Sequence, residues 1–159
     1  RVLGVCGGYQ MLGRTISDPD GVEGVAGSAP GLGLLDVETV LAGEKTLRQT
    51  SGRLATSKAP IAGYEIHIGQ TDGPDAARPF ARVQGSAHGA MSADGRIAGL
   101  YLHGLFDHAE ARAAILAELG APSDGLDQAE RVDGALDRIA EVLEARFDVA
   151  ALSRISGLT

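Results

Sequence analysis

The chain begins with a short, continuous apolar run and then changes to the spacing of a helix. Residues 2–5 predict a buried strand, and helical periodicity follows directly. Cys6 therefore stands where a strand turns into a helix. Residues 17–33 hold Gly, Pro or Asp at nearly every other position and predict a long surface loop. Three later segments predict further strands: 34–41, 47–55 and 61–69.

A hairpin is predicted near residue 95. Asp94-Gly95 separates residues 90–92 from residues 96–102, and this dipeptide is a strong signal for a tight turn between two strands. The second arm is apolar almost throughout, so we expect it to be buried on both faces of a sheet. It ends at His103.

The remainder of the chain is predicted to be helical. Asp107 and Glu110 resemble the capping box of a helix that stops at Gly120. Residues 127–147 place apolar side chains on one face of an amphipathic helix, and residues 148–155 predict a short final helix. Strands first and helices last, with a strand–turn–helix at the front, predict an α/β fold in which helices pack on a sheet.

Composition narrows the functional classes. The length of 159 residues suits one domain, and 23 glycines, about twice the usual share, indicate many tight turns. The net charge of −7 lacks the basic footprint of a nucleic-acid-binding protein, so we expect no nucleic-acid partner. No apolar run approaches the roughly 18 to 20 residues of a membrane helix, so we expect no membrane partner. The single cysteine excludes an internal disulfide and a multi-cysteine metal site, and we expect no metal.

The start of the chain suggests a piece of a longer protein. Position 1 is Arg, and the first predicted strand follows at once without a secretory leader. A lone unpaired thiol fits a cytoplasmic setting. There is no G-x-x-x-x-G-K-[ST] phosphate-binding loop, so we expect no nucleotide cofactor in this segment.

Cys6 is the first candidate for chemistry. Residues 4–8 read Gly-Val-Cys-Gly-Gly and fit the pattern of a nucleophile on a sharp strand-to-helix turn, which needs small neighbours on both sides. The N–H of Gly7 would then be placed to bind an oxyanion. The other interpretation is a cysteine that only packs beside a tight turn, and the pattern alone leaves both open.

A thiolate nucleophile also needs a base, normally His. His103 is best placed, because reactive groups of α/β enzymes gather where buried strands end. We expect His67 to be an ordinary strand residue, and His88 and His108 to be solvated surface residues. The sequence does not by itself place Cys6 near His103.

Four stretches together resemble the class I (triad-type) glutamine amidotransferases, in particular the glutaminase domain of the cobyric acid synthase family of cobalamin biosynthesis. They are residues 2–13 (VLGVCGGYQMLG), 31–39 (GLGLLDVET), 63–69 (GYEIHIG) and 99–106 (GLYLHGLF). The resemblance implies a flavodoxin-like sheet with flanking helices. It also implies that residues 1–159 are the C-terminal part of the domain, without its upstream half or the ATP-dependent amidating domain.

The resemblance implies a mechanism. Cys6 would attack the side-chain amide of glutamine to give a thioester, and His103 would pass the proton to the leaving ammonia. Gln10 matches a family position that contacts bound glutamine, and Gly7 would assist at the oxyanion. ATP and Mg would act in the missing domain, where ammonia would amidate carboxylates of the corrinoid acceptor, adenosylcobyrinic a,c-diamide.

Two departures from the triad pattern matter. Many members have Glu two residues after the catalytic His, but this chain has Leu105, which matches a branch with a Cys–His dyad. Glu65 is a possible substitute for orienting His103. Because the upstream half is missing, we expect weak glutaminase activity or none from the fragment alone.

Three alternatives stay open. Within the class, the chain could belong to a cobyrinic acid a,c-diamide synthase or a cell-wall amidotransferase, although residues 64–67 (YEIH) favour the cobyric acid synthase branch. A cysteine-based redox or chaperone protein would use the thiol without Gln10 or His103. A non-catalytic binding module would not need an intact Cys6 and His103.

Overall fold

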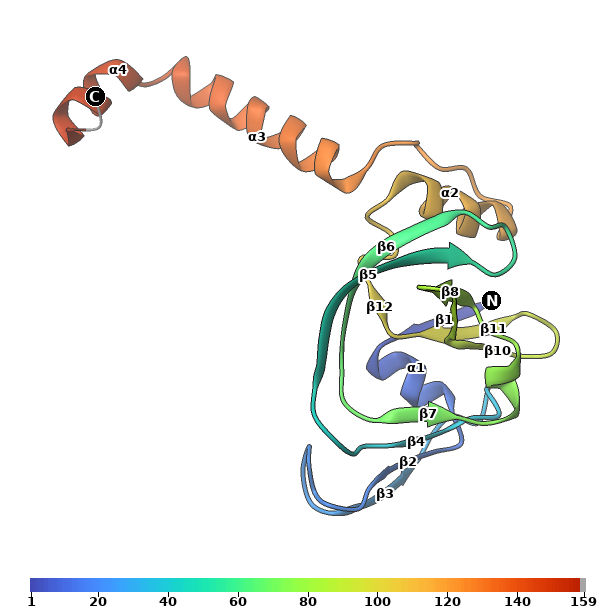
Figure 1. The fold of residues 1–159 in the computed structure, drawn as a ribbon. Coiled ribbons are helices and arrows are strands. Elements are labelled where there is room, and N and C mark those ends of the chain that lie inside the picture. Colours follow the sequence, from blue (N-terminus) through green and yellow to red (C-terminus); the bar gives the residue numbers. More distant parts are fainter. Residues whose placement is uncertain (158–159) are drawn as a thin grey trace. The chain divides into compact units, whose positions relative to one another are not determined.

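The computed structural model describes residues 1–157, apart from the side chain of Thr46. The chain divides into two compact units, Arg1–Gly125 and Leu126–Thr159. The first unit contains three sheets, two helices and a 3-10 helix, and the second is helical (Figure 1). This mixed α/β arrangement confirms the predicted fold class.

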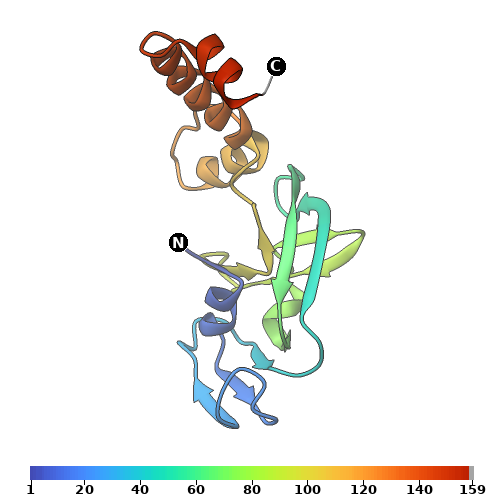
Figure 2. The ribbon, with the colours of Figure 1, turned by 90° about the vertical axis from the view of Figure 1, so that its left-hand side faces the viewer.

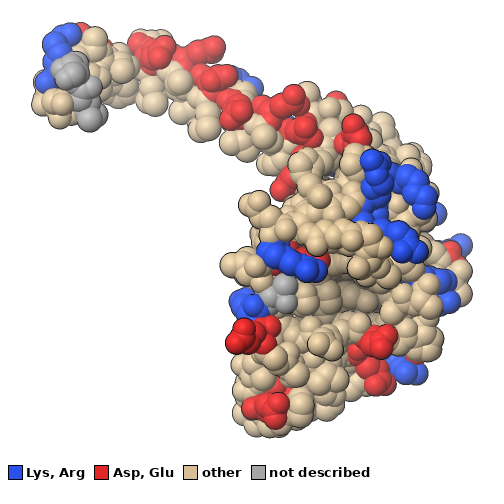
Figure 3. All heavy atoms as spheres, in the orientation of Figure 1, with Lys and Arg blue, Asp and Glu red and all other residues tan. Residues whose placement is uncertain are grey.

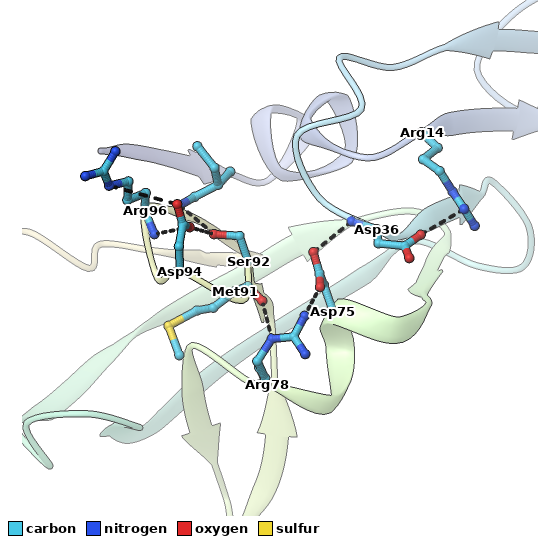
Figure 4. Close-up of polar contacts among 9 residues, drawn as sticks. Arg14, Asp36, Asp75, Arg78, Met91, Ser92, Asp94 and Arg96 are labelled. Atoms are coloured by element: carbon cyan, nitrogen blue, oxygen red, sulfur yellow. Dashed lines mark hydrogen bonds and ion pairs between the residues drawn. The ribbon is translucent and has the colours of Figure 1, made fainter.

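The first sheet has the strand order β1-β11-β10 and sets the position of Cys6. β1 (Val2–Val5) runs parallel to β11 (Ile97–Leu100), while β10 (Ala90–Met91) pairs with β11 in antiparallel fashion. The predicted hairpin is therefore confirmed. Asp94 stabilises its turn, because its carboxylate accepts the backbone N–H of Arg96 and the hydroxyl of Ser92 (Figure 4).

The second sheet is entirely antiparallel, and its longest strands, β5 and β6, lie side by side (Figure 2). These two strands confirm the prediction for 47–55 and 61–69 to within two residues at each end. In sheet order the strands are β12 (Leu102–His103), β6 (Pro60–His67), β5 (Thr46–Leu54), β8 (Ala81–Val83) and β9 (Ser86–His88). Only Tyr101 separates β11 of the first sheet from β12 of the second.

The third sheet corrects two predictions. Its order is β3 (Gly27–Pro30), β2 (Thr15–Asp18), β4 (Glu38–Val40) and β7 (Gln70–Asp72). The predicted loop at 17–33 thus contains a strand and the end of another, and the predicted strand at 34–41 shrinks to three residues. The cause is local. The N–H groups of residues 31–35 donate to backbone carbonyls of residues 11–14, where α1 ends, instead of to a neighbouring strand.

Two helices and a 3-10 helix complete the first unit. They are α1 (Gly7–Leu12), η1 (Pro74–Ala77) and α2 (Ala109–Glu118). The start predicted at Asp107 is wrong, because the backbone N–H of Asp107 closes a turn on Gly104 and the helix begins only after His108. The predicted stop is confirmed, since Gly120 follows the helix with a φ of 72°.

The core of the first unit has two apolar clusters. One lies where β1 and β11, the second sheet and α2 meet, and it includes Leu100, Leu102 and Leu105. The other includes Tyr9 of α1 and Tyr101, which follows β11. Asp75 is one of two buried carboxylates among the described residues, and it bonds to the segment that contributes Leu35 and Val37 to the second cluster. Its carboxylate accepts the backbone N–H of Asp36 and pairs with Arg78, which in turn donates to the carbonyl of Met91 (Figure 4).

The second unit consists of α3 (Gln128–Glu144) and α4 (Val149–Ser156), which confirms both predicted C-terminal helices. At the start of α3, the N–H of Asp127 donates to the carboxylate of Glu130. Acidic side chains follow α3 along the face seen in Figure 3. None of the helices described between residues 1 and 157 has the length and apolar character needed to cross a membrane.

Gly4 and Gly8 give a matched pair of variants for the packing of α1 on β1. A Cβ at Gly4 would lie 2.7 Å from the backbone carbon and oxygen of Gly8, whereas a Cβ at Gly8 would meet nothing within 4 Å. We expect Gly4→Ala to lower the free energy of unfolding by about 1–3 kcal/mol. Gly8→Ala, in a helix, should leave it unchanged or raise it by up to about 1 kcal/mol. Urea unfolding of both variants checks this, and equal losses would contradict the packing described.

Candidate active site

Cys6 has a backbone conformation that residues other than glycine rarely adopt. Its φ is 55° and its ψ is −120°. The Cys6 N–H donates to the carbonyl of Leu100 on β11, and the Cys6 carbonyl accepts the N–H groups of Tyr9 and Gln10. The residue therefore ends β1 and begins α1 in a single step, as the sequence predicted. Gly4 allows the turn, because any side chain there would collide with α1.

The thiol of Cys6 is half-buried against β6. Its Sγ donates to the backbone carbonyl of Ile66 at 3.2 Å. Ile66 stands between Glu65 and His67, so the thiol approaches the strand at the centre of the YEIH segment. In this structure the thiol therefore donates its hydrogen bond to a backbone carbonyl and not to an imidazole.

His103 reaches the same edge of the first sheet by way of β11. The register pairs Val5 with Leu100, so Cys6 and Tyr101 are the first residues beyond two parallel neighbouring strands. His103 follows two positions later, where its ring stacks on Tyr64 of β6 with centroids 5.0 Å apart. Its Nε2 is buried and makes no hydrogen bond within the described chain.

The side chain of Gln10 is held by two contacts beside this edge. Its Nε2 donates to the carbonyl of Ile68 at 3.0 Å and lies 3.2 Å from the hydroxyl of Tyr101. The Tyr101 hydroxyl also lies 2.5 Å from Oγ1 of Thr71. Its ring stacks on that of His67, with centroids 3.7 Å apart. The structure thus brings Cys6, Gln10 and His103 to one region, each with a partner on β6 or just beyond it.

Glu65 does not orient His103 in this structure. The carboxylate is buried, with Arg48 Nε 2.7 Å from one oxygen and His88 Nε2 3.1 Å from the other. The hydrogen bond that Arg48 Nε donates to Glu65, together with the negative charge of Glu65, raises the pKa of Arg48. Both oxygens are therefore directed to residues of β5 and β9, and the contact with His103 that the sequence suggested is absent.

A cavity of about 290 Å³ lies next to these residues. Its polar lining includes Arg48, Glu65, His67, His88 and Tyr101. Burial lowers the pKa of His67 and of His88 more than the neighbouring Glu65 raises it, so both imidazoles are neutral at pH 7. His67 lies on β6, as the sequence predicted. The prediction that His88 is a solvated surface residue is wrong, because its side chain is only 9% exposed. Over the described residues, no three His, Cys, Asp or Glu side chains are grouped to hold a metal ion.

Comparison with known proteins identifies the family of this chain. Residues 1–111 match the family model of the CobB/CobQ-like glutamine amidotransferase domain. This chain belongs to that family. The resemblance found in four sequence stretches is therefore confirmed, and Cys6, Gln10 and His103 all lie inside the matched region.

Relatives of the family match the chain over nearly its whole length. The cobyric acid synthase of Caulobacter sp. (strain K31) is 63% identical over 99% of this chain and 33% of the relative. The cobyric acid synthases of Cereibacter sphaeroides (strain ATCC 17025) and Bradyrhizobium diazoefficiens are 57% and 54% identical, over 96% and 95% of this chain. They are matched over 32% and 31% of their own length, so the chain spans about a third of these relatives.

The buried histidines predict a loss of stability in acid. The folded chain lowers the pKa of His88, so the unfolded chain binds the proton more readily as the pH falls below about 6.5. The stability is therefore complete above that pH and decreases below it. We expect His88→Gln to reduce the fall in melting temperature between pH 7 and pH 5, since glutamine is a polar side chain of similar size that does not titrate. The matched control, His108→Gln at an exposed site, should keep the wild-type fall; equal profiles for all three proteins would contradict the assignment.

Proposed function

We propose that this chain is the glutaminase part of a cobyric acid synthase, in which Cys6 hydrolyses glutamine through a thioester. The observation that supports this best is the conformation of Cys6, a φ of 55° at the end of a strand whose parallel neighbour leads to His103. Membership of the CobB/CobQ-like family and the names of the relatives support the same function. The names also favour it over the other amidotransferases considered from the sequence.

The chemistry follows from the residues at the sheet edge. Sγ of Cys6 attacks the side-chain amide carbon of glutamine, and the thiol proton passes to His103. The oxygen of the tetrahedral intermediate accepts the N–H of Gly7. His103 then gives its proton to the leaving nitrogen, which departs as ammonia and leaves a glutamyl thioester. Water, deprotonated by His103, cleaves the thioester and releases glutamate and the free thiol.

One rearrangement is part of this proposal. The thiol now donates to the Ile66 carbonyl, so its side chain must turn from β6 toward His103 before the proton is transferred. Gln10 lies on the first helix after the nucleophile and is proposed to contact the bound glutamine. Glu65 is left out of the reaction, because its oxygens are directed to Arg48 and His88.

The use of the ammonia is proposed for the whole protein. The chain spans about a third of its relatives and has no phosphate-binding loop, so we assign ATP and Mg to another part of the enzyme. There ammonia would form amides with side-chain carboxylates of adenosylcobyrinic a,c-diamide. A cytoplasmic setting belongs to the same proposal.

Labelling by a diazoketone analogue of glutamine tests the role of Cys6 and His103. In the full-length protein we expect one covalent adduct by intact mass, blocked by excess glutamine and absent in Cys6→Ser. His103→Ala should slow labelling about 100-fold or more, because it removes the general base. The matched control is His108→Ala, an exposed helix-cap residue whose side chain makes no capping hydrogen bond, and it should label at the wild-type rate.

Labelling that ignores both glutamine and His103→Ala would identify an ordinary reactive cysteine. The amidotransferase proposal would then be abandoned in favour of a redox function for the thiol.

A further inference from the structure

We infer that Tyr101 is a positioning residue: it fixes the carboxamide of Gln10 so that Gln10 turns only its acceptor oxygen toward bound glutamine. This inference rests on the proposed function and adds a residue to it. Tyr101 itself does not touch the reacting atoms. It acts through Gln10, and its position follows from the chain of hydrogen bonds around its hydroxyl.

The amide nitrogen of Gln10 is fixed by two acceptors. A backbone carbonyl can only accept a hydrogen bond, so the amide atom that lies 3.0 Å from the Ile68 carbonyl must be the NH₂ group. The second N–H of the same group is directed to the Tyr101 hydroxyl, 3.2 Å away. Both amide hydrogens of Gln10 are therefore used within the protein.

The hydroxyl proton of Tyr101 is directed away from Gln10. Because its oxygen accepts from Gln10, its own proton is free to be donated to Thr71 Oγ1 at 2.5 Å. Thr71 Oγ1 lies 2.7 Å from Thr39 Oγ1, and the two threonines are register partners in the third sheet. The series of hydrogen bonds that begins at Gln10 therefore ends in that sheet. Burial raises the pKa of Tyr101, so the phenol keeps this proton at neutral pH.

The ring of Tyr101 is held rigidly by its neighbours. Tyr101 is only 7% exposed and follows β11 at the level of Cys6. Its ring lies at 71° to the Tyr9 ring, with centroids 5.2 Å apart, and stacks on the His67 ring with 16° between the planes. A side chain held by packing on two sides and by hydrogen bonds at its tip can hold a neighbour in one orientation.

The consequence is a defined polarity at Gln10. The amide nitrogen has no hydrogen left to donate, while Oε1 makes no hydrogen bond within the described residues. The side chain therefore offers bound glutamine an acceptor only, and it recognises an N–H group of the ligand. Without Tyr101 the amide would keep one anchor, at Ile68, and lose the contact that sets its second direction.

Steady-state kinetics of the full-length protein test this. In Tyr101→Phe we expect the KM for glutamine to rise about 10-fold, the effect of one lost hydrogen bond, with kcat within about twofold of wild type. Tyr9→Phe is the matched control, because it removes a phenol hydroxyl from the adjacent ring that makes no hydrogen bond in the described chain. It should leave KM unchanged.

Two further variants separate positioning from a loss of fold. Thr71→Val should raise KM as Tyr101→Phe does, whereas Thr71→Ser, which keeps the hydroxyl, should restore a value near wild type. The double variant Gln10→Ala/Tyr101→Phe should have the KM of Gln10→Ala alone, because Tyr101 acts through Gln10.

The outcomes distinguish this inference from the function on which it rests. Turnover that requires Cys6, together with an unchanged KM in Tyr101→Phe, overturns the role of Tyr101 and leaves the glutaminase proposal standing. A fall in kcat alone, or additive effects in the double variant, also overturns it. A wild-type protein that does not hydrolyse glutamine overturns the proposed function, and the inference with it.

Discussion

The backbone of Cys6 is the constraint on which the rest of the site depends. A residue with a side chain at a φ of 55° is strained by about 1–3 kcal/mol, so neighbouring contacts must hold it there. They do so from both directions, since the N–H is bonded to β11 and the carbonyl to the first turn of α1. The absence of a side chain at Gly4 lets that turn lie against β1. Strand pairing, helix start and thiol position are thus set by one residue.

The second support of the site is a single strand. β6 and the residues just after it provide the Ile66 carbonyl for the thiol, the Ile68 carbonyl for Gln10 and the Tyr64 ring for His103. The approach of β12 to β6 needs Gly63, because a Cβ there would collide with the carbonyl of His103. The sheet that contains β6 is therefore not only a scaffold beside the first sheet. It fixes the side chains of Cys6 and Gln10, which come from outside the sheet, and that of His103 on its own strand β12.

Local patterns in the sequence were enough to predict the parts of the site that depend on neighbouring residues. The turn at Cys6 and the strand before His103 are of this kind, and so is the hairpin around Asp94. The long-range parts could not be predicted in this way. Arg48, Glu65 and His88 come from three strands, and only the antiparallel pairing of β5, β6, β8 and β9 brings them together. The third sheet was missed because the backbone of residues 31–35 bonds to the end of α1, which no local pattern signals.

Leu105 stands at the position where the resemblance to triad-type amidotransferases implies a glutamate, and its surroundings explain a leucine there. Leu105 is buried in the apolar cluster with Leu100 and Leu102, and a carboxylate there would lack a polar partner in that cluster. The ring of His103 is instead held by stacking on Tyr64, with 8° between the ring planes. Stacking sets the plane of an imidazole without a hydrogen bond, whereas a carboxylate would hold the ring through one of its nitrogens. The position of His103 is therefore determined by packing on β6 and not by a partner carboxylate.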